Sequence, residues 1–120
     1  MGSETDIQRD IISALGAMGF FVWRNHTQGV MVRGSRRVKN KNAGSPDIMA
    51  LKNGVFYAIE VKTKTGKVSD EQIQWLRDAN GQGAVAMVVR SLQDVLDIIE
   101  DLGRKKNRVA DMVDSMFICV

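Results

Sequence analysis

Hydrophobic positions along this chain follow two spacings, one typical of helices and one typical of strands, and together they predict its elements. Apolar residues recur at helical spacing from Ile7 to Met18, and Ser3 with Asp6 forms a capping-box pattern just before them. We therefore expect a first helix over about residues 4–18. The same spacing returns three times, and it predicts further helices over residues 69–81, 91–103 and 109–117.

Shorter runs of β-branched and aromatic residues predict the strands. The strongest signal is Asn53-Gly54, a two-residue hairpin turn between the runs 47–51 and 55–62. A continuous apolar run over 84–89 is typical of a central strand that is covered on both faces. The order of the elements predicts an α/β sandwich around a mixed sheet, with helices on both sides. Two more strands, one buried and one short, are expected over residues 20–23 and 30–32.

Length and composition fit one globular domain over residues 1–120, with a core over about 3–103 and a C-terminal extension over 104–120. The chain is 44% hydrophobic and 26% charged, which excludes a disordered or collagen-like protein. No apolar run approaches the roughly 18 residues that cross a bilayer. No signal-peptide pattern is present, and the single Cys119 cannot form an intrachain disulfide. We therefore expect a protein of the reducing cytoplasm without a membrane segment.

Charge is distributed unevenly along the chain. The segment from Arg24 to Lys41 holds six basic residues and no acid, whereas the whole chain has a net charge of only +3. A basic, glycine-containing segment attached to a slightly acidic body favours a loop that grips a polyanion. The alternative is an ordinary solvated basic loop.

The predicted hairpin brings two acidic residues together. If Asn53 and Gly54 form the turn, Lys52 faces Val55, and the same register sets Asp47 opposite Glu60. Directly opposed residues lie on one face with Cβ atoms about 4.5–5.5 Å apart, where two carboxylates repel each other unless a cation lies between them. Oxygen ligands without His or Cys suit a hard ion such as Mg²⁺, with Mn²⁺ as a substitute.

Strand alternation then places Lys62 on the same face as Glu60 and turns Val61 into the core. An ammonium group at that point can orient or help deprotonate an attacking water and offset charge on a phosphate. Two alternatives remain. Glu60 and Lys62 could form an ordinary ion pair while Asp47 caps a turn, or a three-residue loop could shift the register and set Asp47 opposite Ile59.

These residues resemble a known signature. Gly44-Ser45-Pro46-Asp47 followed by Ile59-Glu60-Val61-Lys62 is similar to the core motif of the PD-(D/E)xK nucleases, whose restriction-endonuclease-like fold is the same sandwich. The chain resembles most closely the virus-type replication-repair nuclease (VRR-NUC) domains, whose stand-alone members are small phage and bacterial proteins. The resemblance covers about residues 3–100. It also rests on Glu4, Gln8, Val22-Trp23-Arg24-Asn25, Gln72 and Trp75-Leu76.

The resemblance implies roles for individual residues. Asp47, Glu60 and the backbone carbonyl of Val61 would hold the divalent ion, and Lys62 would serve the attacking water. Glu4 would reach the same site, directly or through a water on the ion, although an acid at a helix N-terminus is favourable in any case. Gln72 would support the site from the second helix, or merely close a capping box with Ser69.

In the same way, DNA would be the polyanion, and cleavage would leave a 5′-phosphate and a 3′-hydroxyl. Basic side chains that contact phosphates position a duplex without reading its sequence, so binding should be salt-sensitive. As phosphate contacts we expect Arg24, Arg33, Arg36, Arg37, Lys39, Lys41, Lys64 and Lys67.

The leading hypothesis is therefore a Mg²⁺-dependent endodeoxyribonuclease that acts on branched DNA, in the cytoplasm of a bacterium or a phage-infected cell. The resemblance to the stand-alone members implies that the reaction would be Holliday junction resolution by a homodimer, and a two-fold dimer would present two active sites to a four-way junction. The tail helix would either cover the domain's own sheet or meet its copy in a second subunit. The alternatives are a flap, nick or restriction-type nuclease, and a nucleic-acid-binding module that does not cut.

Overall fold

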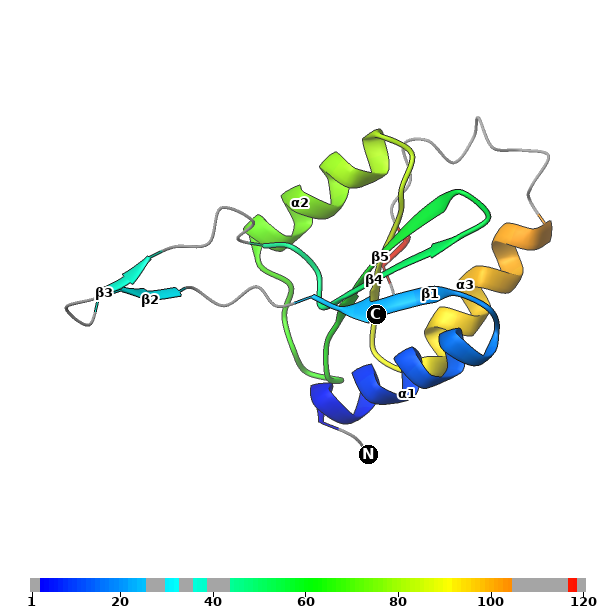
Figure 1. Ribbon diagram of the computed structural model, residues 1–120, viewed down its shortest axis with the longest axis horizontal. Coiled ribbons are helices and arrows are strands. Elements are labelled where there is room, and N and C mark those ends of the chain that lie inside the picture. The colour runs from blue at the N-terminus through cyan, green and yellow to red at the C-terminus, as the bar shows by residue number, and fades with distance from the viewer. Residues whose placement is uncertain (1–2, 26–29, 33–35, 39–43, 105–116, 119–120) are drawn as a thin grey trace.

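The computed structural model describes residues 3–25, 30–32, 36–38, 44–104 and 117–118 (Figure 1). Its helices match the first three that the spacing predicts to within two residues. Its elements are α1 (Glu4–Ala17), β1 (Phe21–Arg24), β2 (Val30–Val32), β3 (Arg36–Val38), β4 (Ile48–Lys52), β5 (Val55–Val61), α2 (Asp70–Gly81), β6 (Val85–Val89), α3 (Leu92–Arg104) and β7 (Phe117–Ile118).

The main sheet is mixed, as predicted, with the strand order β1-β4-β5-β6-β7. Strands β1, β4 and β5 pair antiparallel, whereas β5, β6 and β7 pair parallel. The β4–β5 hairpin turns at Asn53 and Gly54, whose φ angles of 52° and 81° are the left-handed values that a tight type I′ turn requires. The predicted register is confirmed, because Lys52 pairs with Val55 and Ile48 pairs with Ile59.

Helices cover both faces of the sheet. In Figure 1, α2 lies above the sheet and α1 below it. Helices α1 and α3 share the larger apolar cluster with one face of β4, β5 and β6. On the other face, Leu76 of α2 packs on Ala58, Ala86 and Val88 in a smaller cluster. The predicted sandwich is therefore confirmed, and it has one large core and one small one.

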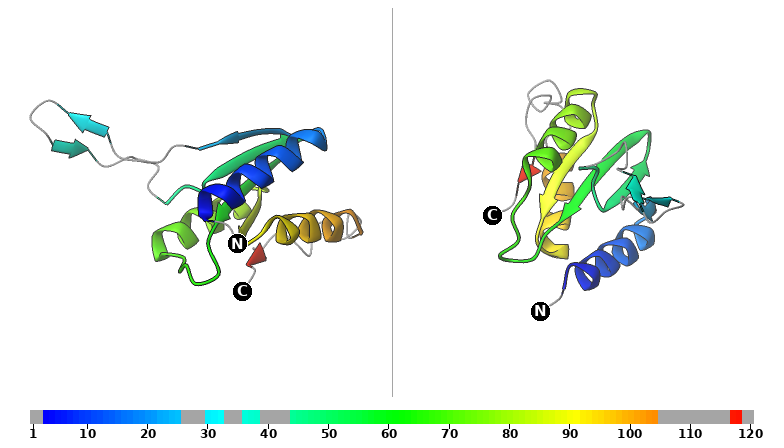
Figure 2. Two further views of the ribbon diagram at one scale, coloured as in Figure 1. Left: turned by 90° about the horizontal axis from the view of Figure 1, so that it is seen from below. Right: turned by 90° about the vertical axis from the view of Figure 1, so that its left-hand side faces the viewer.

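Strands β2 and β3 form a separate two-stranded antiparallel sheet, which Figure 2 shows standing off the body of the molecule. The short strand expected over residues 30–32 is confirmed. Sequence patterns do not predict its partner, because two of the three residues of β3 are arginines and give no apolar alternation.

Two expectations require correction. The strand expected to be buried over 20–23 runs from Phe21 to Arg24 and lies at the edge of the main sheet, where Phe21 is 68% exposed and only the preceding Phe20 is buried. The predicted tail helix is wrong at Phe117, which belongs to β7 and pairs with Met87 of β6. The rest of that prediction falls on residues 105–116, outside the described residues.

No helix within the described ranges is long and apolar enough to cross a membrane.

Candidate functional site

The hairpin places Asp47 and Glu60 side by side at one end of the main sheet. Asp47 directly precedes β4, and Glu60 is the next-to-last residue of β5. The pairing of Ile48 with Ile59 leads directly to Asp47 opposite Glu60. The backbone N–H of Asn25 donates to the Asp47 carbonyl oxygen at 2.7 Å, so the edge strand holds the backbone at Asp47 from the other side.

The carboxylate of Asp47 reaches across to the end of β5. Its Oδ2 atom accepts a hydrogen bond from the backbone N–H of Val61 at 2.8 Å. The Val61 side chain is fully buried in the larger core, so its predicted inward orientation is confirmed. Adjacent residues of β5 therefore have different roles. Val61 packs inward and tethers Asp47 through its amide, while Glu60 faces α2.

Glu60 is buried, with 2% of its surface exposed. Its Oε2 atom accepts from Nε2 of Gln72 at 3.1 Å and lies 3.4 Å from Nζ of Lys62. Burial raises the pKa of Glu60 to about 8, the negative charge of Asp47 adds to the rise, and the Lys62 ammonium opposes it. The other oxygen, Oε1, is buried and has no hydrogen-bond partner among the described residues.

A bare carboxylate oxygen in this position fits a hard divalent cation. Ionising Glu60 without a cation would leave a buried charged oxygen unpartnered beside a second carboxylate, and this cost is why its pKa is raised. A cation on Oε1 of Glu60 would give that oxygen a partner and offset the repulsion from Asp47. The candidate ligands around it are oxygen atoms, which Mg²⁺ and Mn²⁺ prefer. The residues present therefore fit the ion that the sequence predicts.

Glu4 is not part of this pair. It is the first residue of α1 and is half-buried. In the part of the chain that the structure describes, no group of three or more His, Cys, Asp or Glu side chains is placed to hold a metal ion. A role for Glu4 at the site stays a prediction.

Gln72 makes both contacts that the sequence offers as alternatives: it closes the capping box with Ser69, and it supports Glu60. Its Oε1 atom accepts from the Ser69 backbone N–H at 2.9 Å, which closes the capping box of α2. Its Nε2 group donates to Glu60. Because one amide serves both, the start of α2 is fixed relative to the buried carboxylate.

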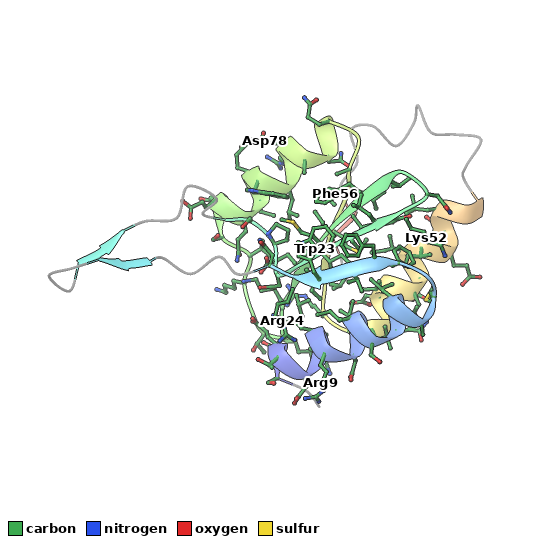
Figure 3. All side chains as sticks on the ribbon, viewed as in Figure 1. Arg9, Trp23, Arg24, Lys52, Phe56 and Asp78 are labelled. Carbon is green, nitrogen blue, oxygen red and sulfur yellow. The ribbon has the colours of Figure 1, made fainter. Side chains whose placement is uncertain are left out.

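The predicted phosphate contacts lie in different parts of the molecule. Arg24 is exposed at the end of β1, where Figure 3 labels it beside α1, and Lys64 and Lys67 are exposed on the loop after β5. The backbone of Arg36 and Arg37 lies in β3. The other three fall outside the described residues, namely Arg33, Lys39 and Lys41.

Two residues support the site through contacts that the sequence patterns do not predict. The Asn25 amide donates to Ser45 Oγ at 3.0 Å and to the Pro46 carbonyl at 2.9 Å, next to Asp47. The Arg90 guanidinium donates through Nη1 to the carbonyls of Thr63 at 2.5 Å and Gly66 at 2.8 Å, on the loop after Lys62. Each of these hydrogen bonds joins residues 20 or more positions apart, so no local sequence pattern predicts it.

The chain is similar to known nuclease domains. A family model described as the VRR-NUC domain matches residues 4–93. A solved structure described as a VRR_NUC domain is 26% identical with a TM-score of 0.59, over 81% of this chain and 94% of that one. The structure of a Holliday junction resolvase from the archaeal hyperthermophile Archaeoglobus fulgidus is 28% identical with a TM-score of 0.50, over 72% of this chain and 67% of that one. No curated protein matches the chain.

Proposed function

The chain belongs to the VRR-NUC family of PD-(D/E)xK-type nucleases, and from that membership we propose that it is a Mg²⁺-dependent endodeoxyribonuclease that cuts branched DNA as a homodimer. In this proposal, residues 1–120 form one nuclease domain that acts in the cytoplasm of a bacterial or phage-infected cell.

The observation that carries the proposal is the buried Glu60 carboxylate, which faces Asp47 and leaves one oxygen without a partner among the described residues. A protein that only bound DNA would gain nothing from this arrangement, because opposed carboxylates destabilise a sheet. The geometry therefore favours a nuclease over a binding module that does not cut.

Asp47, Glu60 and the backbone carbonyl of Val61 would hold the Mg²⁺ ion, for which Mn²⁺ would substitute. A bound divalent ion would supply Lewis-acid chemistry there, polarising the phosphoryl oxygen and lowering the pKa of the attacking water. Lys62, whose ammonium lies 3.4 Å from Glu60 Oε2, orients that water and offsets charge on the phosphate. Gln72 holds Glu60 in place from α2 through its 3.1 Å hydrogen bond. Glu4 would complete the site from the start of α1.

Branched DNA is the proposed substrate because one of the similar structures is a Holliday junction resolvase. A junction has two equivalent strands to cut, so a two-fold homodimer with one site in each subunit matches its symmetry. The basic segment that includes the β2–β3 hairpin would contact phosphates, together with Lys64 and Lys67 near the active site. A flap, nick or restriction-type nuclease would use the same catalytic residues.

A cleavage assay tests the proposal. Labelled four-way junction, flap, nicked and linear duplex are incubated with the protein in Mg²⁺ or in chelator. We expect paired symmetric nicks in the junction, only with metal, and a dimer by sedimentation. Cutting of flap or linear DNA would support the alternative nuclease, and binding without product in any metal would refute the nuclease proposal.

Two matched pairs of variants control the assay. Asp47→Ala should abolish cleavage while DNA binding persists, whereas Asp78→Ala, on the exposed side of α2, should cut normally. Lys62→Ala should lose cleavage, and Lys52→Ala, at the far end of β4, should retain it.

A further inference from the structure

Asn25 ties the edge strand to the turn that carries Asp47. It follows β1 directly, and its backbone N–H donates to the Asp47 carbonyl at 2.7 Å. Its side-chain amide, a separate group, donates to Ser45 Oγ at 3.0 Å and to the Pro46 carbonyl at 2.9 Å. One residue therefore makes three hydrogen bonds to three consecutive residues of the turn.

The turn needs such a donor. Pro46 has no backbone N–H with which to bond its surroundings. Ser45 is only 5% exposed and the Pro46 side chain is fully buried, so the polar groups of this turn have little access to water. A buried acceptor without a partner costs about 1–3 kcal/mol. The Asn25 amide satisfies two such acceptors at once, and it does so immediately before Asp47.

The turn controls the position of the Asp47 carboxylate. The Asp47 carboxylate accepts from the Val61 amide through Oδ2 at 2.8 Å, and this contact aims it at the site that Glu60 shares. A small shift of the turn would lengthen the hydrogen bond between Asp47 and the Val61 amide, because only two covalent bonds join the carboxylate carbon of Asp47 to the backbone that the turn fixes.

We propose that Asn25 is a positioning residue for the proposed active site: its amide fixes the Ser45–Pro46 turn and thereby aims the Asp47 carboxylate at the cation site. The inference rests on the proposed function for the role of Asp47. The aiming itself does not depend on metal, DNA or catalysis, and it can be measured without them.

The first test measures amide hydrogen exchange in the metal-free protein. In Asn25→Ala, exchange of the Val61 amide should become about 10-fold faster, the loss expected for one hydrogen bond. The Lys62 amide is an internal control, since it donates to the Val89 carbonyl at 2.9 Å and does not touch Asp47. Its exchange should not change. Equal acceleration at both amides, or none at Val61, would overturn the proposal.

A near-isosteric variant separates hydrogen bonding from shape. Asn25→Asp keeps the size of the side chain but replaces its N–H donors with a carboxylate that repels the Pro46 carbonyl. We expect Val61 exchange in Asn25→Asp to be at least as fast as in Asn25→Ala. Wild-type protection in Asn25→Asp would show that the shape matters and not the donors, which would also overturn the proposal.

The second test measures Mn²⁺ binding to the free protein by electron paramagnetic resonance. Removing a group that orients a ligand weakens metal affinity by about 10- to 100-fold, so we expect about a 10-fold loss in Asn25→Ala. Binding of junction DNA in chelator should stay unchanged. Lys52→Ala is the control, because it removes a 2.7 Å hydrogen bond to the Met18 carbonyl far from the site and should keep wild-type Mn²⁺ affinity.

The two tests also distinguish this inference from the proposed function. Faster Val61 exchange in Asn25→Ala with no Mn²⁺ binding in the wild type would support the aiming of Asp47 and refute the metal site. Unchanged exchange with intact metal-dependent cleavage would refute the role of Asn25 and leave the nuclease proposal standing.

Discussion

The two faces of the main sheet are built from the same strands, yet they differ in composition and use. On the face toward α1 and α3, the strands present large apolar side chains that are fully buried, among them Ile48, Ile59, Val61, Met87 and Val89. On the face toward α2, the buried side chains of the sheet are the small residues Ala58, Ala86 and Val88, with the carboxyl group of Glu60 beyond them. The first face supplies most of the apolar burial, and the second holds Glu60, one of the proposed catalytic residues.

This division explains how a small domain tolerates a poorly satisfied carboxylate. Alternation along β5 sends Ile59 and Val61 to one face and Ala58 and Glu60 to the other. A single strand can therefore gain stability on one side and hold a costly group on the other. Substitutions of adjacent residues on β5 should therefore separate stability from activity.

The largest effect is expected on cleavage, from Glu60→Gln. This change keeps the size of the side chain but removes the charge that a cation requires, so we expect cleavage to fall by about 1000-fold or more, roughly 4 kcal/mol of transition-state stabilisation. The free energy of unfolding in metal-free buffer at pH 8 should not decrease. Single-turnover assays on labelled junction and urea unfolding would measure the two quantities, and a destabilised Glu60→Gln would contradict the division between the faces.

The pair of carboxylates behind that prediction can be located from the sequence by local rules. Asn53-Gly54 sets the hairpin register, and the register brings Asp47 and Glu60 together, because turn type and strand alternation depend only on neighbouring residues. The supporting contacts cannot be found in this way. The bonds from Asn25 to Pro46 and from Arg90 to Gly66 join distant segments, and only the packed fold brings those segments together.

The dependence on contacts between distant segments also explains the two errors in the predicted fold. Phe117 fits the helical spacing of the tail, but β6 offers an open edge, and pairing with that edge overrides local spacing. Phe21 reads as a buried strand residue because its neighbours are apolar, yet it lies on an edge strand where 68% of it is exposed. Sequence patterns thus predict which elements form, and they fail where the outcome depends on which neighbour an element meets.

A smaller effect, confined to stability, is expected from Ile59→Ala. Ile59 is fully buried against α1 and α3, and truncating a buried isoleucine costs about 2–5 kcal/mol. Glu60 and its partners lie on the opposite face, so cleavage per folded molecule should stay within about 3-fold of wild type at low temperature, less than about 1 kcal/mol. Urea unfolding and active-site titration would check this. A loss of cleavage as large as that of Glu60→Gln would show that the two faces are not separable.

The third effect is a pH dependence of stability in the metal-free protein. Burial and the Asp47 charge raise the pKa of Glu60 from the ordinary 4.5 to about 8 in the folded state. Between these values the folded protein keeps a proton that the unfolded chain has released, so the stabilisation is complete below pH 4.5 and is lost as pH rises through 8. The loss is at most about 1.4 kcal/mol per pH unit.

Other groups titrate over the same range, so the informative quantity is the difference between wild type and Glu60→Gln. Glutamine does not titrate, and the free energy of unfolding of wild type relative to this variant should fall steadily from about pH 5 to pH 8 in chelator. Millimolar Mn²⁺ should abolish the fall, because an ion on the carboxylate replaces the proton and stabilises the charged form. A pH-independent difference in chelator would mean that Glu60 is ionised without a cation, and the α2 face would then bear no cost for its chemistry.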